Sequence, residues 1–170
     1  MLERPETNEY NAYFKGYIDL VPEGNLIEIL LQQIEETKKL CHSLTSEQAE
    51  YKYAEGKWSV KEVLGHMADT ERVMNYRLLA IARGDSTNLP SFDEKAYAAN
   101  AHFNQLELHQ ILFELSNVRQ STLSLLSTLS DQSLQKLGTV NNTPTSARAV
   151  AYILAGHELH HLKILKERYL

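Results

Sequence analysis

Three of the seven histidines lie within five positions near the end of the chain, in the segment Gly156-His157-Glu158-Leu159-His160-His161-Leu162. His157 and His161 are four residues apart, so on a helix their imidazoles project from one face at the separation that a single metal ion needs. Both fall on the apolar stripe of the segment, where buried imidazoles need partners. One of them could be a hydrogen-bonded core histidine with the other at the rim, but the pair favours a metal ion.

A metal site needs at least a third protein ligand. Only nine residues follow His161, so the third ligand is expected upstream. His66 is the best placed, because it borders the inward stripe of an earlier predicted helix. These three histidines would leave positions open for water or substrate. His160 is expected either to support this set or to replace one member of it. The remaining histidines are weaker candidates because they are expected in loops or facing solvent: His42, His102 and His109.

Two further polar residues are candidates for catalytic or supporting roles. Asp69 lies about one turn beyond His66 and could orient a ligand or a metal-bound water, although an exposed helix carboxylate fits the same pattern. Arg119 falls near the inward stripe of another predicted helix, where a buried guanidinium could hold a carboxylate. Alternatively, the Arg119 side chain extends to the surface.

The segment from His157 to His161 also spells H-E-x-x-H, the zinc protease motif, in which Glu158 would be the general base. A third ligand would then be expected downstream, where little chain remains, and no edge strand is predicted to hold a peptide. In the three-histidine arrangement Glu158 points about 100° away from the histidines, so surface or interface packing is predicted for it. A di-iron bundle needs two Glu-x-x-His pairs, and Glu158 with His161 supplies one. A mononuclear site is therefore favoured.

Composition limits the class of protein. The chain has 170 residues, 43% hydrophobic and 23% charged, which predicts one soluble globular domain spanning residues 1–170. No apolar run is long enough for a membrane span, and no signal peptide is apparent, so a cytoplasmic protein is expected. The single cysteine, Cys41, agrees with a reducing compartment. The net charge of −5 argues against a nucleic-acid partner.

Four amphipathic segments must position these residues. Their apolar spacing predicts helices that follow Asn25, run from Ser59 to Arg83, begin at Asn104 and begin near Thr145. The second opens on a capping box and is stopped by Gly84. No stretch alternates as a strand does, so an all-α four-helix bundle is predicted.

Two other segments complete the expected fold. The connection between helices two and three, from Gly84 to Phe103, is too long for a hairpin turn and is expected to cross the bundle or cover one end of it. Residues 1–24 are rich in aromatic side chains and are expected to form an arm packed on the bundle.

Several motifs resemble the DinB/YfiT-like superfamily of metal-binding four-helix bundles, and the resemblance covers nearly the whole chain. The similar runs are Gly56-Lys57-Trp58-Ser59-Val60-Lys61-Glu62-Val63-Leu64-Gly65-His66, Asp69-Thr70-Glu71-Arg72, Ala82-Arg83-Gly84-Asp85 and Gly156-His157-Glu158-Leu159-His160-His161. The family pattern of one histidine on the second helix and H-x-x-x-H on the last falls on His66, His157 and His161, the set reached above from spacing.

The resemblance implies one divalent ion per chain, zinc or nickel, and a homodimer. It also implies two kinds of chemistry. One is a transferase that activates a low-molecular-weight thiol, such as bacillithiol, for conjugation to an electrophile, so that a small thiol and an electrophile are the expected partners. The other is a hydrolase that uses a metal-bound water. A non-catalytic, metal-stabilised interaction module is a third alternative. Metal-assisted formation of a thiolate is the favoured mechanism.

Overall fold

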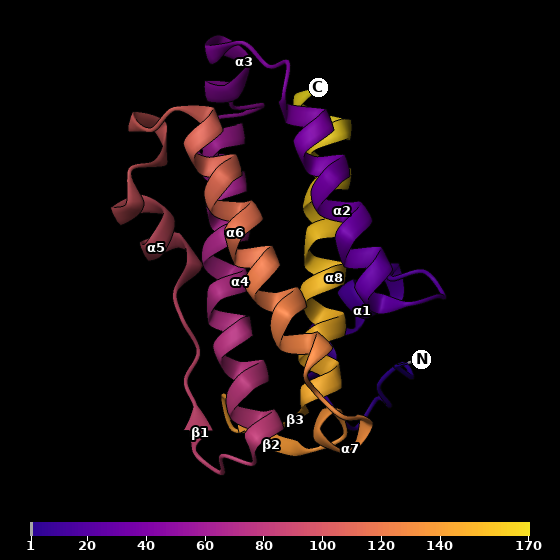
Figure 1. Ribbon diagram of the computed structural model, residues 1–170. Coiled ribbons are helices and arrows are strands. Elements are labelled where there is room, and N and C mark those ends of the chain that lie inside the picture. Colours follow the sequence, from indigo (N-terminus) through magenta and orange to yellow (C-terminus); the bar gives the residue numbers. More distant parts are fainter. Residues whose placement is uncertain (1) are drawn as a thin grey trace.

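The computed structural model describes residues 2–170 and contains the expected four-helix bundle. Figure 1 shows four long helices running side by side along the length of the molecule. They are α2 (Leu26–Cys41), α4 (Val60–Arg83), α6 (Leu108–Ser127) and α8 (Ala147–Ile164). Within the described residues, none of the helices combines the length and apolar character that crossing a bilayer requires.

The ends of α4 and α8, the two histidine-bearing helices, are set by local side chains. At the start of α4, Ser59 Oγ accepts a hydrogen bond from the Glu62 amide, and the Glu62 carboxylate accepts one from the Ser59 amide. Gly84 ends α4 with a positive φ of 85°, which glycine adopts without strain. Ser146 caps α8 by accepting from the amide of Ala149. These caps fix where α4 and α8 begin and where α4 ends.

Two predicted helix starts differ from the structure. The third long helix begins at Leu108, after a 3-10 turn η2 (Phe103–Gln105), and not at Asn104. The Asn104 side chain instead accepts a hydrogen bond from Ser59 Oγ at 2.6 Å, which joins it to the start of α4. The fourth begins at Ala147, because residues 143–146 form a strand.

A small sheet at one end of the bundle was not predicted. Strands β2 (Leu137–Val140) and β3 (Thr143–Ser146) form an antiparallel hairpin, and β1 (Asn88–Leu89) pairs in parallel with β2. Asn141 and Asn142 make the hairpin turn with φ values of 48° and 60°, as a two-residue turn of type I′ requires. Strands of two to four residues are too short to give a visible alternation, but the Asn-Asn pair was a usable signal.

The long connection between α4 and α6 is called here the crossover segment (residues 84–107). It contains β1 and the short helix α5 (Glu94–Ala101), and it passes along the outer side of α4 in Figure 1. Gly65 on α4 allows this approach, because a Cβ there would lie 2.4 Å from the ring of Phe103. The crossover segment therefore covers the face of α4 near His66.

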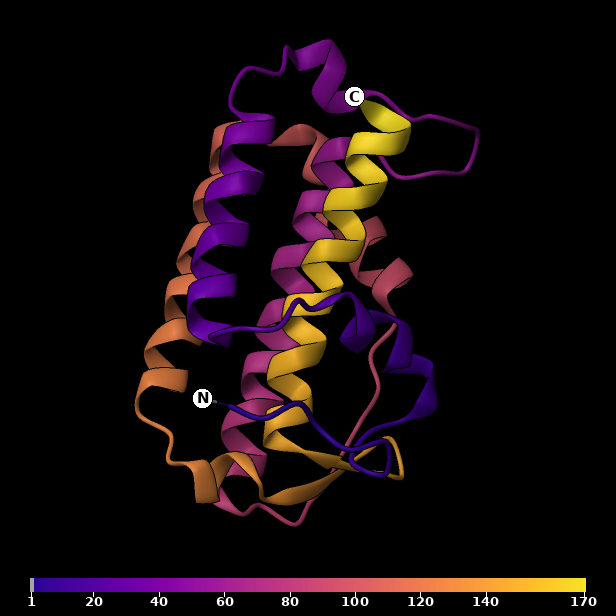
Figure 2. The same cartoon turned by 90° about the vertical axis from the view of Figure 1, so that its right-hand side faces the viewer.

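The N-terminal segment (residues 2–25) lies across α8, as Figure 2 shows. It contains the turn η1 (Ala12–Phe14) and helix α1 (Lys15–Leu20). Tyr10, Ile18 and Val21 are buried in the same apolar cluster as residues of α8. The approach is close at Gly156, where a Cβ would lie 2.0 Å from the Tyr17 carbonyl oxygen. Only a residue without a side chain fits under α1 at this position.

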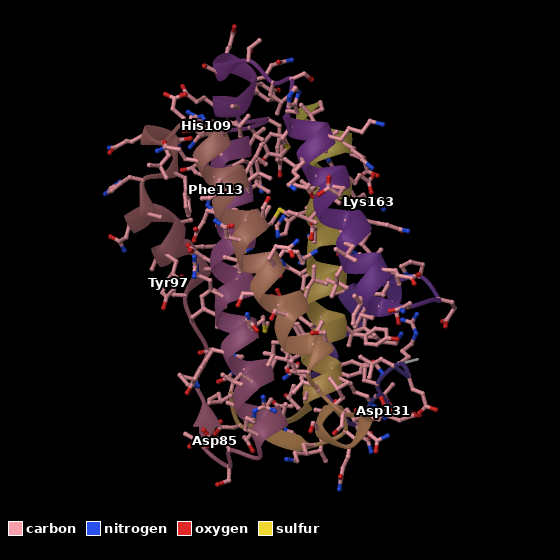
Figure 3. The ribbon with its side chains drawn as sticks, in the orientation of Figure 1. Asp85, Tyr97, His109, Phe113, Asp131 and Lys163 are labelled. Atoms are coloured by element: carbon pink, nitrogen blue, oxygen red, sulfur yellow. The ribbon has the colours of Figure 1, made fainter. Side chains whose placement is uncertain are left out.

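Shorter elements close the two ends of the bundle: α3 (Ser46–Glu50), α7 (Asp131–Leu134) and the terminal turn η3 (Leu165–Tyr169). The core consists of two apolar clusters, one toward the sheet end and one around Ile34, Leu64 and Leu115. The outer surface is largely polar, with a few exposed aromatic side chains such as Phe113 on α6 and Tyr97 on α5 (Figure 3).

Candidate metal centre

The structure brings His66 of α4 together with His157 and His161 of α8. The Nε2 atom of His157 lies 3.1 Å from Nε2 of His66 and 3.1 Å from Nε2 of His161. One nitrogen from each ring lies within 4.8 Å of the other two. All three side chains are buried, with exposed fractions of 3%, 7% and 8%. The three rings thus direct nitrogens at a common point inside the bundle.

Burial keeps these three imidazoles neutral at physiological pH. It lowers the pKa of His66 to about 4 and that of His161 to about 3. The pKa of His157 is lowered well below its usual value by burial and by the neighbouring imidazoles. A neutral imidazole offers a lone pair, which is the form that binds a metal.

The convergence of three Nε2 atoms fits a cation better than it fits hydrogen bonding. A neutral imidazole nitrogen either donates one hydrogen bond or accepts one. His157 Nε2 therefore cannot satisfy both His66 and His161, although it lies 3.1 Å from each. Nitrogens bound to zinc at about 2.0–2.1 Å in a tetrahedral arrangement lie roughly 3.3–3.4 Å apart, close to the observed separations. The three side chains therefore fit a divalent ion.

The other predicted residues lie outside this cluster. His160 is half-buried and its ring packs edge-on against Tyr17 and His161. Asp69 is half-buried, and burial raises its pKa. The side chain next to His66 is that of Thr70, whose hydroxyl oxygen lies 3.4 Å from His66 Nδ1. The three histidines expected in loops or facing solvent are exposed: His42, His102 and His109. Figure 3 shows His109 on the outer side of α6.

The prediction that Glu158 serves surface or interface packing was wrong. Glu158 is 2% exposed, accepts a hydrogen bond from Thr37 Oγ1 at 2.6 Å and pairs with Arg119 at 2.5 Å. α8 is covered by the other helices on one side and by the N-terminal segment on the other. A side chain that turns away from the histidines therefore still enters the core. Burial raises the pKa of Glu158, and Arg119 and Thr37 oppose this effect.

Arg119 is the buried guanidinium that the sequence offered as one of two alternatives. It is fully buried and donates two hydrogen bonds of 2.7 Å to the Glu71 carboxylate and one of 2.8 Å to the Leu30 carbonyl oxygen. Burial alone would lower the pKa of Arg119, but Glu158 and Glu71 outweigh it and raise the pKa. The network joins α2, α4, α6 and α8 and contacts none of the three histidines.

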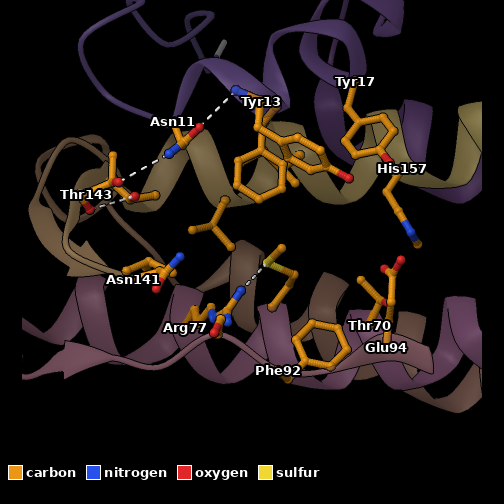
Figure 4. A pocket seen from close by; sticks show the side chains of 17 residues that line it. Asn11, Tyr13, Tyr17, Thr70, Arg77, Phe92, Glu94, Asn141, Thr143 and His157 are labelled. Carbon is orange, nitrogen blue, oxygen red and sulfur yellow. Dashed lines mark hydrogen bonds between the residues drawn. The ribbon is translucent and has the colours of Figure 1, made fainter. Parts of the chain in front are cut away.

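A cavity of about 350 Å³ leads to His157 between the N-terminal segment, the crossover segment and the helices α4 and α8 (Figure 4). We call it the aromatic cavity. Its volume is in the range of small-molecule sites. The lining side chains include four aromatic rings and several polar groups: Tyr13, Phe14, Tyr17, Phe92, Asn11, Thr70, Arg77, Glu94, Asn141 and Thr143.

Three residues of the cavity were missed by sequence reasoning. Glu94 Oε2 lies 4.0 Å from His66 Nε2 and the side chain is half-exposed. The ring of Tyr17 packs edge-on against His157, and burial raises the pKa of Tyr17, so it keeps its proton. Arg77 lies on the same helix as His66. Glu94 and Tyr17 come from segments without long helical periodicity, so no sequence signal pointed to them. Arg77 could have been found, because its spacing of eleven residues from His66 places both side chains on one face of the helix.

Comparisons with known proteins agree with this fold. The sequence model of the DinB superfamily matches residues 29–165. A protein of Oceanobacillus iheyensis named "putative metal-dependent hydrolase" is 31% identical over an alignment of 155 residues. The match covers 86% of this chain and 88% of that protein. YfiT from Bacillus subtilis, described as a probable metal-dependent hydrolase with an unusual four-helix bundle topology, superposes with a TM-score of 0.74. That similarity covers 97% of this chain and 90% of YfiT at 19% identity and supports the fold.

Proposed function

This chain belongs to the DinB superfamily, and from that premise we propose that it is a metal-dependent enzyme that transfers a low-molecular-weight thiol to an electrophilic small molecule. The observation that carries the proposal is the convergence of three neutral imidazoles at the aromatic cavity. His66, His157 and His161 would hold the ion. A divalent ion with open positions lowers the pKa of a thiol or a water that binds to it.

The shape and lining of the cavity support a small-molecule reaction. Its volume of about 350 Å³ suits a metabolite-sized ligand, and its aromatic walls favour an organic molecule with apolar parts. Glu158, the base that a zinc protease would use, is held by Arg119 and Thr37 inside the core. It is therefore not available to a substrate, and the H-E-x-x-H match does not support proteolysis.

Two side chains of the cavity can handle protons beside the histidines. Glu94 Oε2 is placed to accept the proton that a nucleophile loses, since it lies 4.0 Å from His66 Nε2 and half of the side chain reaches solvent. Tyr17 keeps its phenolic proton at neutral pH because burial raises its pKa. Its hydroxyl can therefore donate a hydrogen bond to an oxygen of the electrophile.

Hydrolysis is the second candidate, and Glu94 is the observation that favours it. A thiol bound to a divalent ion is a strong enough acid to ionise without a base, whereas a water molecule gains more from a nearby carboxylate. The two candidates differ in whether turnover requires an added thiol.

The ligand assignment is tested by metal analysis of protein purified without chelator. The expected result is about one divalent ion per chain in the unaltered protein and a loss of tenfold or more in metal affinity for His161→Ala. His109→Ala, an exposed histidine on α6, is the matched control and should bind metal normally. Full occupancy in His66→Ala or His161→Ala would contradict the assignment.

The reaction is tested on the metal-loaded protein with a chromogenic electrophile and a neutral aryl ester, each with and without a panel of low-molecular-weight thiols. Turnover of the electrophile that requires thiol and metal is expected for the transferase. Cleavage of the ester that is independent of thiol and abolished by Glu94→Gln would replace it with the hydrolase.

A further inference from the structure

The aromatic cavity contains a second charged group besides Glu94. Arg77 on α4 is 5% exposed and lines the cavity wall. Its Nη2 donates a hydrogen bond of 2.6 Å to the Pro90 carbonyl oxygen, and its Nη1 lies 3.5 Å from Met74 Sδ. A guanidinium has five N–H donors, and neither of these partners carries a charge. Most of the binding capacity of Arg77 is therefore unused.

The contrast with Arg119 shows what is missing. Arg119 is fully buried and pairs with two carboxylates, Glu71 and Glu158. Within residues 2–170, no carboxylate lies within ion-pair distance of Arg77. Burial lowers the pKa of Arg77, and no carboxylate opposes that effect. Buried charges in proteins are normally paired, because an unpaired one costs several kcal/mol. An anion that enters the cavity would supply the missing partner.

The groups at the two ends of the aromatic cavity indicate the shape of its ligand. His66, Thr70, Met74 and Arg77 follow one another at helical spacing and form one stripe of α4, with about 16 Å of helix axis between the first and the last. Figure 4 shows Arg77 near Phe92 and Asn141, whereas Glu94 and His157 lie together at the other end of the cavity. Phe92 lies beneath the Arg77 guanidinium, 5.8 Å from ring centroid to Cζ. A ligand that reaches both ends is elongated, with an apolar middle.

We propose that Arg77 is the anion-recognition residue of the aromatic cavity, and that the substrate carries a carboxylate or similar anionic group at the end opposite its reacting group. The position of the reacting group at the three histidines rests on the proposed function. The binding of an anion at Arg77 rests on the burial and the missing partner of Arg77 alone.

The test is calorimetric binding to the zinc-loaded protein with matched pairs of probes. One pair is 6-mercaptohexanoate and 6-mercaptohexanol, and the other is hexanoate and hexanol, which lack the thiol. The unaltered protein should bind each carboxylate about tenfold to a hundredfold more tightly than its neutral counterpart, as expected for a charge-assisted hydrogen bond in a buried site. Arg77→Met should remove this preference and leave binding of the neutral probes unchanged.

Control variants separate recognition from folding. Arg72→Met removes an exposed guanidinium from the same helix, one that pairs with Glu114, and should keep the preference. Zinc content and circular dichroism establish that each variant is folded. If Arg77→Met does not fold, Arg77→Gln removes the charge while keeping a donor for the Pro90 carbonyl, and it should lose the preference in the same way.

The inference would be contradicted if the unaltered protein showed no preference for carboxylates. It would also be contradicted if the folded Arg77 variants kept the full preference, because the carboxylate would then bind to the metal instead. Failure of the proposed function would look different. A carboxylate preference that depends on Arg77 and holds for hexanoate, together with no thiol-dependent turnover, would support the anion site and refute thiol transfer.

Discussion

Replacing Arg119 with methionine should be among the most damaging single changes in the bundle. Methionine approximates the volume of the side chain but removes the charge and four hydrogen bonds. The Glu71 and Glu158 carboxylates, 3% and 2% exposed, would then be buried without a cation between them. The Leu30 carbonyl would also lose its donor.

The expected loss is about 3–5 kcal/mol in the free energy of unfolding, the usual cost of removing one partner of a buried ion pair. For a domain of this size, each kcal/mol lowers the melting temperature by about 2–4 °C, so a decrease of roughly 6–20 °C is expected. The measurement is thermal and urea denaturation at pH 7, with Arg119→Met and the unaltered protein at equal zinc content.

A triple variant provides the control for this reasoning. Adding Glu71→Gln and Glu158→Gln to Arg119→Met removes the two unpaired charges, so the triple variant should recover much of the lost stability. The single variant should also lose less at pH 5 than at pH 7, because unpaired buried carboxylates bind protons more tightly in the folded state. A loss below about 1 kcal/mol, or a triple variant no more stable than the single one, would refute the account.

Three further outcomes are expected. A chelator should lower the melting temperature but leave the helical circular dichroism signal, because the apolar clusters lie on both sides of the metal site; collapse of that signal would show a structural ion. Gly156→Ala should cost about 1–3 kcal/mol in thermal denaturation, because its Cβ would meet the Tyr17 carbonyl oxygen at 2.0 Å, whereas Gly16→Ala, with no atom within 4 Å, should not destabilise. Arg148 hydrogen-bonds to Glu9 and lowers the pKa of Glu9 to about 2. This contact should therefore contribute at most about 3 kcal/mol to the free energy of unfolding above pH 4.5, and the contribution should decline as the pH falls toward 2. Glu9→Gln should therefore be less stable at pH 7, and this deficit should shrink as the pH falls below 4.5. A deficit that does not shrink over the acid range in which the protein stays folded would show that the contribution does not come from the charge.

Local sequence signals predicted the parts of this protein that short-range physics determines. The capping box at Ser59 set the start of α4 to the residue, and helical spacing placed His157 and His161 on one face. His66 could be selected because it borders the inward stripe of a long, strongly periodic helix. Each of these inferences needed no knowledge of how distant segments meet.

The features that were missed depend on contacts between distant segments. Glu158 was assigned to the surface because helix geometry gives its direction relative to the histidines, but not what covers that side of α8. Its partner Arg119 is 39 residues away along the chain. Glu94 reaches the site from a crossover segment whose path no periodicity records. The hairpin was not predicted because strands of four residues are too short to show a clear alternation of apolar and polar residues.

The clustered histidines and the wall of the aromatic cavity come from different parts of the fold, which bears on how such a protein could diversify. The three histidines come from two helices of the bundle, whereas most of the cavity wall comes from the N-terminal segment, the crossover segment and the hairpin. Insertions and substitutions in these connecting segments can reshape the cavity while the two helices keep their register. Chains that share the histidine pattern can therefore inherit one reactive centre and yet accept unrelated substrates. Exchanging the segments between homologues would be a direct way to transplant selectivity without rebuilding the helices.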